Sequence, residues 1–559
     1  MVAGRAPFCD EGAVSDPGEA SPPPSAPPSV SPPPPLGAPA PVDTTSASAA
    51  GAPPDAADVT RTAGRGGLAL AGAKVSFIIF GFIQQLILPY LLGGDGYGKV
   101  SRVLVIVSII NNVTIATSIQ GVSRAVSRAP AAEVEAAFAR TLRVHVVVAM
   151  AVSTIFAATA GWIADAIGAA HVTTPLRLAA AVVMLYGVYG PLVGALNGRR
   201  RFLDQAGLDV GYGMLRTASV AAGALLFLRF GASGVVGAIA GFVFAAVVIV
   251  PVAISRAGLG KVGSGGPSTV EYLGFLGPLA VGQIFLNLLF QTDFMLLSRA
   301  LGQAAGDDSA AADRLVGAYR GVQLFSFLPY QMLVSINFIL FPMLARAHAE
   351  GDRDAVKRFV GTGVRLAFIL TGMMCGTVSA LAPYVLRFAF PANSGFAENG
   401  ADALRISSLG MGAFAILGIV SAALTSLKRE RTTAVLTAAT VAMVAAGCLT
   451  VIPRAQFGPQ MLTYAATVTA CVLLTAAVVG GFYLRSVAGG FVRPLTLVRV
   501  LIATAVVVIL GPSAPWLGKP AVLVEAAAMG AAYLVVLVVL GELGKDDLAT
   551  VRRALGRRR

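Results

Sequence analysis

Long apolar runs recur along this chain almost to its C-terminus, and they limit how it can fold more than any other feature. A run of about 20 mainly apolar residues crosses the hydrocarbon core of a bilayer as a helix. Inside lipid the backbone polar groups must be hydrogen-bonded internally, so these runs must be helical. Hydrophobic residues make up 56% of the 559 residues and charged residues only 13%, which excludes an ordinary water-soluble protein. The sequence therefore predicts an all-α polytopic membrane protein.

The lengths of the apolar runs predict about fourteen transmembrane helices. They lie near residues 66–92, 100–122, 144–168, 176–197, 207–229, 233–254, 272–300, 316–343, 360–390, 401–426, 432–453, 458–483, 494–512 and 519–541. The loops between them alternate in charge: one set is basic, as at 199–201 and 428–431, and the other is neutral or acidic. Basic loops stay in the cytoplasm. We therefore expect a multi-pass protein of the bacterial plasma (inner) membrane with both termini cytoplasmic.

The two ends of the chain differ from the rest in composition. Residues 1–62 are rich in proline and poor in aromatic side chains, which predicts a disordered cytoplasmic tail. Residues 542–559 form a basic cytoplasmic tail. The net charge of +14 gathers in short loops and at the C-terminus, which indicates membrane topology and contact with anionic lipid, without a nucleic-acid partner.

Residue types that carry out catalysis or bind metals are sparse and scattered. The cysteines are Cys9, Cys375, Cys448 and Cys471, and the histidines are His145, His171 and His348. Their spacing matches neither a disulfide framework nor a metal site, so we expect no metal and no cofactor. The histidines are expected at the membrane interface. Because no nucleophile–base or phosphate-loop pattern is present, we do not expect an enzyme.

The first and second sets of six predicted spans resemble each other. Arg124 and Arg346 lie 222 residues apart, as do Tyr97 and Tyr319. Further on, Arg200 and Arg201 match Lys428 and Arg429. This predicts two pseudo-symmetric six-helix lobes in parallel orientation, residues 63–256 and 257–490, followed by two extra transmembrane helices in residues 491–541.

Polar residues within the predicted spans are candidates for function, because an ionisable group in lipid needs a cavity or a partner. The binding-site candidates are Lys74, Arg102, Arg216, Gln283, Asn287, Gln291 and Arg320, and Asp293 is a possible site of ion coupling. Arg216 lies near the middle of its span and either faces a cavity or pairs with Asp209 or another helix. The stripe of Gln283, Asn287 and Gln291 either lines a wet cavity or bonds to a neighbouring helix. Arg102 and Arg320 either snorkel to the interface or face an outer cavity.

Short patterns at the ends of two spans resemble the polysaccharide flippase branch of the multidrug/oligosaccharidyl-lipid/polysaccharide (MOP) exporter superfamily. They are Leu92-Gly93 with Gly96-Tyr97-Gly98, and Phe341-Pro342 with Ala345-Arg346 and Glu350-Gly351-Asp352. The similarity covers about residues 62–490. It implies two six-helix lobes around a V-shaped cavity, alternating access, and a polyprenyl-pyrophosphate-linked oligosaccharide as cargo, with H+ or Na+ as a possible coupling ion. The candidate cations would then hold the pyrophosphate, and the amide side chains would bind the sugars.

Other functions stay open at this point. A multidrug or cation antiporter of the same superfamily would rely on buried carboxylates, for which Asp293 and Asp209 are the candidates. A membrane glycan polymerase or ligase is less consistent with the sequence, since the longest outer loop, about residues 301–315, lacks histidine. A flippase-like scaffold that no longer transports is a third alternative. The excess of cations within the spans favours the lipid-linked cargo.

Overall fold

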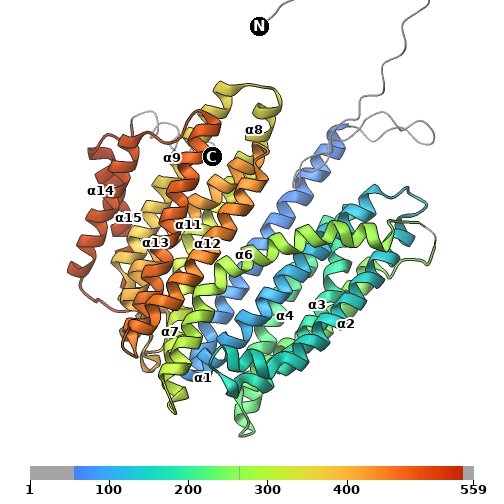
Figure 1. Cartoon of the computed structure of the whole chain (residues 1–559), viewed down its shortest axis with the longest axis horizontal. Coiled ribbons are helices and arrows are strands. Elements are labelled where there is room, and N and C mark those ends of the chain that lie inside the picture. Colours follow the sequence, from blue (N-terminus) through green and yellow to red (C-terminus); the bar gives the residue numbers. More distant parts are fainter. Residues whose placement is uncertain (1–55, 264, 545–559) are drawn as a thin grey trace, which may run out of the picture. The chain divides into compact units, whose positions relative to one another are not determined.

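The computed structural model describes residues 56–263 and 265–544, and this part of the chain is helical without strands (Figure 1). Most of each predicted tail lies outside the described residues, except that residues 56–62 already belong to the first helix and residues 542–544 follow the last one. The long helices are α1 (Ala56–Arg128), α2 (Val134–Ala166), α3 (Thr173–Gly198), α4 (Phe202–Arg229), α5 (Gly234–Ala257), α6 (Thr269–Ala304), α7 (Ser309–Ser326), α8 (Leu328–Ala349), α9 (Arg353–Ala380), α11 (Phe396–Ser426), α12 (Glu430–Val451), α13 (Pro459–Ala488), α14 (Pro494–Leu510) and α15 (Ala521–Val539). Shorter helical segments are η1 (Ala170–Val172), α10 (Ala382–Ala389), η2 (Ala392–Ser394), η3 (Ile452–Arg454) and η4 (Gly511–Ser513).

Twelve helices in the described ranges are long and apolar enough to cross a membrane, which confirms the predicted helical membrane fold. The predicted number of about fourteen is not confirmed. The first two predicted spans lie within α1, which is bent at Gly93, where φ is 72°. Glycine adopts this left-handed conformation without a Cβ clash, so the chain changes direction at one residue instead of through the expected loop. The eighth predicted span is divided between α7 and α8.

Two connections show the same unusual backbone geometry at positions that the sequence repeat matches. Arg200 and Lys428 both have φ of 59°, and within the described ranges no other non-glycine residue has positive φ. In each case the next residue donates its backbone N–H to a carbonyl five residues earlier, from Arg201 to Leu196 and from Arg429 to Leu424. The shared turn supports the internal repeat, while the boundaries of the lobes stay a prediction.

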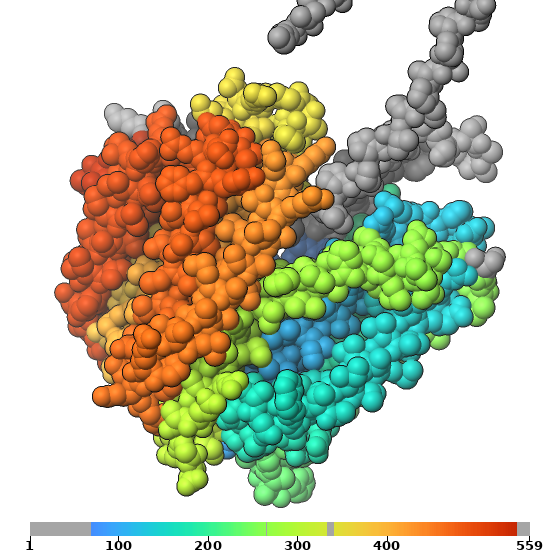
Figure 2. Space-filling view, in the orientation of Figure 1, coloured from blue at the N-terminus to red at the C-terminus, as the bar shows by residue number. Residues whose placement is uncertain are grey.

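Helix α6 connects the two groups of helices. Helices α1, α3, α4 and α5 pack together, with α2 against α3, and α11 packs with α9, α13 and α8. Helix α6 contacts both α1 and α12, and Figure 2 shows it in yellow-green between these parts. The groups also meet where α1 lies along α7. The close packing of α1 on α7 requires glycine at position 98, because a Cβ at Gly98 would overlap the Asp313 carbonyl.

The two C-terminal helices pack against α9 and are joined to it by a buried carboxylate. Glu542 accepts hydrogen bonds from Arg365 of α9 at 2.7 Å and from Thr496 and Arg499 of α14 at 2.9 and 3.3 Å. Its side chain is 3% exposed. Glu542, predicted as the first residue of the C-terminal tail, is therefore part of the packed structure.

This carboxylate makes thermal stability depend on pH. Burial alone would raise the pKa of Glu542, but the hydrogen bonds from Arg365, Thr496 and Arg499 and the charge of Arg365 lower it below the ordinary value of 4.5. A lowered pKa in the folded state gives stability that is present above the ordinary value and is lost as pH falls through the lowered one. We expect Glu542→Gln to reduce the melting temperature at pH 7 and to flatten its fall in acid, measured by thermal unfolding in detergent. An unchanged acid dependence would contradict this assignment.

Candidate functional site

The structure distributes the eight residues singled out in the sequence over four places. Lys74 of α1 and Arg216 of α4 lie where these two helices pack together, and Gln283, Asn287 and Gln291 lie along α6. Asp293 and Arg320 lie between α6 and α7, and Arg102 lies where α1, α6 and α7 meet. Each place has its own set of partners, so the candidates do not form one continuous site in this structure.

Arg216 is held in α4 by aromatic side chains instead of by a carboxylate. Its guanidinium carbon lies 4.7 Å from the ring centre of Phe77 on α1 and 5.9 Å from that of Phe242 on α5. Its Nε is buried and has no hydrogen-bond partner among the described residues. No ion pair to Arg216 is present in the described part of the chain. Stacking on aromatic faces therefore positions a cation whose hydrogen-bonding capacity is not fully used.

Asp209, the predicted alternative partner of Arg216, pairs with another residue. Asp209, about two helical turns before Arg216, lies 2.8 Å from the Lys74 amine on α1. The Asp209 side chain is 9% exposed, whereas that of Lys74 is 53% exposed. The pair leaves Lys74 accessible and leaves Arg216 as the cation without a countercharge.

Sequence reasoning missed a cluster of three tyrosines, two of which, Tyr186 and Tyr212, interact with Arg216. The rings of Tyr186 and Tyr189 on α3 lie 5.7 and 5.5 Å from the ring of Tyr212 on α4. The hydroxyls of Tyr189 and Tyr212 are buried, and neither has a partner at good hydrogen-bond geometry within the described structure, although Tyr212 interacts with Tyr186. Buried hydroxyls are normally hydrogen-bonded, so these two are available to water or to a bound hydroxyl compound. The sequence signal was two tyrosines, three positions apart, within one apolar run.

The polar stripe of α6 bonds to a neighbouring helix at its centre. Asn112 of α1 donates to the side-chain oxygen of Asn287 at 2.8 Å, and Asn287 donates to the backbone oxygen of Gln283 at the same distance. This is the helix–helix alternative for Asn287, and it joins α1 to α6. Gln283 is partly exposed, and the buried Oε1 of Gln291 has no partner among the residues described. The stripe therefore does not present one uniform polar surface.

Asp293 is the centre of a buried network between α6 and α7. It accepts hydrogen bonds from Tyr319 at 2.7 Å, from Gln323 at 3.2 Å and from the backbone N–H of Phe294 at 2.7 Å. Arg320 donates to the side-chain oxygen of Gln323 at 3.0 Å instead of contacting Asp293 directly. Tyr97, which the repeat matches to Tyr319, donates to Gln85 within α1, so both copies use this tyrosine to join helical segments.

Arg102 forms a buried clamp together with Asp313 of α7. The Arg102 Nε lies 2.9 Å from an Asp313 oxygen, and both side chains are fully buried. Arg102 also donates to the hydroxyl of Ser298 on α6 at 2.6 Å and to the carbonyl of Ile167, which follows α2, at 3.0 Å. A cation with this many partners holds helices together and does not face an open cavity.

Two histidines lie in specific contacts that the sequence did not indicate. His171 lies 2.8 Å from the second Asp313 oxygen and joins η1 to the clamp. His145 was expected at the membrane interface, but it is buried between Ser118 and the hydroxyl of Tyr272, at 3.2 and 2.8 Å. These partners on α1 and α6 bury His145, which sequence periodicity alone cannot reveal, while its depth in the membrane stays a prediction.

Comparison with known proteins supports this architecture. The family model described as "Polysaccharide biosynthesis protein" matches residues 63–348, more than half of the chain. A probable multidrug resistance protein NorM from Deinococcus radiodurans is 32% identical over 135 residues, which is 24% of this chain and 27% of that protein. The chain therefore matches only about a quarter of the length of this relative.

Solved structures share the fold at low identity. A lipid II flippase MurJ in an inward closed conformation has a TM-score of 0.67 and 13% identity, covering 85% of this chain and 99% of MurJ. A multidrug resistance MATE family transporter, inward-facing, has a TM-score of 0.59 and 13% identity, covering 74% of this chain and 94% of its own. A MOP superfamily transporter from Pyrococcus furiosus has a TM-score of 0.54 and 13% identity, with 77% and 95% covered. The chain therefore belongs to the polysaccharide biosynthesis protein family, and its helical membrane fold is similar to that of MurJ and of MATE and other MOP superfamily transporters.

Proposed function

We propose that this protein flips polyprenyl-pyrophosphate-linked oligosaccharides across the bacterial plasma membrane for polysaccharide biosynthesis, with both termini in the cytoplasm. The observation that carries the proposal is Arg216, a cation within a membrane-spanning helix that has aromatic neighbours and no ion pair in the described structure. An uncompensated cation at this depth is costly unless an anion binds there. The pyrophosphate of such a cargo supplies that anion.

The side chains around Arg216 match the remaining chemistry of the cargo. The Lys74 amine, half-exposed on α1, provides a second positive charge, which Asp209 partly neutralises. The buried hydroxyls of Tyr189 and Tyr212 provide hydrogen bonds for sugar hydroxyls. The polyprenyl tail needs no protein partner because it remains in the bilayer.

Alternating access would require the two groups of helices to separate at one end while they close at the other. The Arg102–Asp313 clamp supports this, because it joins α1 to α7 at the end that the loop charges place outside the cell. We propose that the lobes rock about this contact, that Gln283 and Gln291 face the cargo path when the clamp opens, and that Arg320 then approaches it from α7. A proton or a sodium ion would couple the cycle.

A multidrug or cation antiporter is the second candidate function. The buried Asp293, which holds Tyr319 and Gln323, is the type of carboxylate that can carry a coupling cation. The local match to the probable multidrug resistance protein NorM points in the same direction. The two candidates differ in the sign of the cargo charge and can be separated on that basis.

Binding to the purified protein tests the proposal. We expect polyprenyl pyrophosphate to raise the melting temperature more than the neutral polyprenol, because only the former neutralises Arg216. Arg216→Gln should remove most of this difference, whereas Arg229→Gln, an exposed arginine at the end of the same helix, should retain it. Equal stabilisation by the alcohol and the pyrophosphate would reject the proposed anion site.

A further inference from the structure

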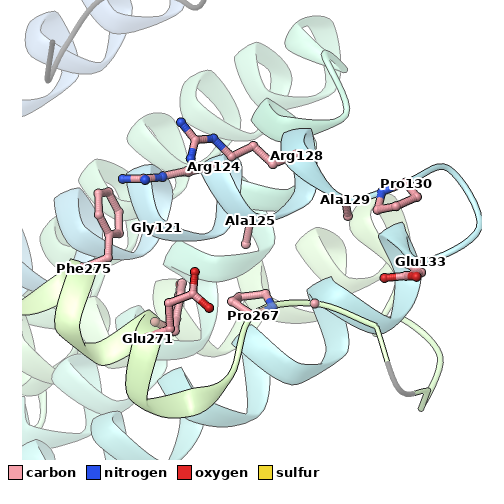
Figure 3. Close-up of a pocket in the computed structure, with 12 residues that line it drawn as sticks. Gly121, Arg124, Ala125, Arg128, Ala129, Pro130, Glu133, Pro267, Glu271 and Phe275 are labelled. Atoms are coloured by element: carbon pink, nitrogen blue, oxygen red, sulfur yellow. The ribbon is translucent and has the colours of Figure 1, made fainter. Parts of the chain in front are cut away.

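A pocket of about 360 Å³ lies apart from Arg216, where the end of α1 meets the start of α2 and the start of α6 (Figure 3). Its charged and aromatic lining consists of Arg124, Arg128, Glu133, Glu271, Tyr272 and Phe275. The volume is at the lower end for ligand pockets, which suits a compact polar group and not a whole lipid-linked oligosaccharide. Arg124 and Arg128 lie at the end of α1, in a basic segment that the charge pattern predicts at the cytoplasmic face.

The two arginines of this pocket are positioned but not neutralised. The Arg124 guanidinium carbon lies 4.1 Å from the ring centre of Phe275, and Arg124 is close enough to Arg128 for mutual repulsion. Figure 3 shows both side chains reaching from α1 toward the same region. Neither arginine has an ion pair or a side-chain hydrogen bond within residues 56–263 and 265–544. Two adjacent guanidinium groups without acceptors match the oxygens of a phosphate.

Two carboxylates line the same pocket and limit which phosphate compound fits. Glu271 points from α6 toward α1, and it interacts electrostatically with Arg124. Glu133 lies near Pro130. In the described structure neither carboxylate makes an ion pair within 4.0 Å or a side-chain hydrogen bond. The lining thus carries two positive and two negative charges, which suits a zwitterion better than a simple anion.

The walls of the pocket are held in place by the protein. The Tyr272 hydroxyl bonds to His145 at 2.8 Å, and Arg140 donates to the carbonyl of Gly266 at 3.2 Å. Gly121 is needed at the back wall, because a Cβ there would lie 2.6 Å from Leu276. The walls of the pocket are therefore fixed by packing, and the four charged side chains line its exposed side.

We propose that this pocket binds a phosphoethanolamine group, as found in the headgroup of phosphatidylethanolamine or in a soluble phosphoethanolamine compound. The phosphate would contact Arg124 and Arg128, and the ammonium would donate to Glu271, with Glu133 as the second acceptor. Because α1 and α6 belong to different predicted lobes, the occupant favours the arrangement of these helices in which Arg124 faces Glu271.

Thermal stability of the full-length protein in detergent, titrated with defined lipids, tests this proposal. We expect phosphatidylethanolamine to stabilise it more than phosphatidylglycerol, which lacks the ammonium, and more than phosphatidylcholine, whose quaternary nitrogen cannot donate a hydrogen bond. The double variant Arg124→Gln with Arg128→Gln should weaken the affinity for phosphatidylethanolamine, taken from this titration, at least about tenfold, because charged hydrogen bonds are lost. The matched control, Arg429→Gln with Arg431→Gln, removes two exposed charges from another predicted cytoplasmic loop and should not change it.

A second variant keeps the proposal falsifiable if the double arginine variant does not fold. Glu271→Gln should abolish the preference for phosphatidylethanolamine over phosphatidylglycerol while it leaves the arginines intact. Competition by glycerophosphoethanolamine would identify a soluble ligand of the same chemistry, and its absence would identify the lipid. A response to phosphatidylglycerol as strong as that to phosphatidylethanolamine, or equal loss in the Arg429 and Arg431 control, would overturn the assignment.

Discussion

Arg216→Ala is expected to lower cargo flipping in proteoliposomes by at least about tenfold, because hydrogen bonds to charged groups contribute about 1.5–3 kcal/mol each. The protein should remain folded, since the contacts with Phe77 and Phe242 are worth about 2 kcal/mol each. Arg216→Lys should recover only part of the activity, because an ammonium cannot bind phosphate through two parallel hydrogen bonds.

The control for this result lies on the same helix. Arg229→Ala removes an exposed arginine at the end of α4 and should leave flipping unchanged. Gel filtration and the melting temperature establish that each variant is folded before transport is compared. Normal flipping by a folded Arg216→Ala protein would show that Arg216 is not an essential contact for the cargo.

Asp313→Asn is expected to open the clamp between α1 and α7, since Arg102 would then be buried without a countercharge. Breaking a buried ion pair from one side typically costs about 3–5 kcal/mol. This cost destabilises the closed arrangement of α1 and α7, so the helices should separate more readily at this end. A cysteine introduced at Ala312, which is buried beside Asp313, should then react faster with a membrane-impermeant maleimide added outside.

Replacing both partners separates the charge effect from a packing effect. Arg102→Met with Asp313→Leu removes both charges, so the double variant should recover much of the closed state and its slow labelling. The native cysteines must be replaced in all variants, because Cys471 is exposed. Labelling at position 312 that does not change in Asp313→Asn would contradict the role of the clamp.

The general architecture could be predicted because it follows from local sequence. Apolar runs specify helices in lipid, and the repeat matches Arg200 with Lys428, which share a φ of 59°. The predicted loop between the first two spans is wrong for a local reason as well. Gly93 bends α1 at a single residue, so the glycine-rich sequence that looked like a loop continues as helix.

The partners of the polar residues could not be predicted, because one sequence does not show which helices become neighbours. Arg102 lies within a predicted span, but its partner Asp313 falls in the predicted outer loop. Arg216 likewise lies within a predicted span, whereas the pairing of Asp209 with Lys74 depends on the packing of α4 on α1. Periodicity assigns a face to a residue but does not assign the helix that the face meets.

Transport of a defined cargo by the reconstituted protein tests the central claim most directly. We expect proteoliposomes to move a fluorescent polyprenyl-pyrophosphate-linked saccharide between leaflets, to lose this activity in Arg216→Ala, and not to accumulate an amphiphilic cationic dye. Movement of the cationic dye that is abolished by Asp293→Asn, together with no flipping of the pyrophosphate-linked saccharide, would contradict the account and favour the antiporter.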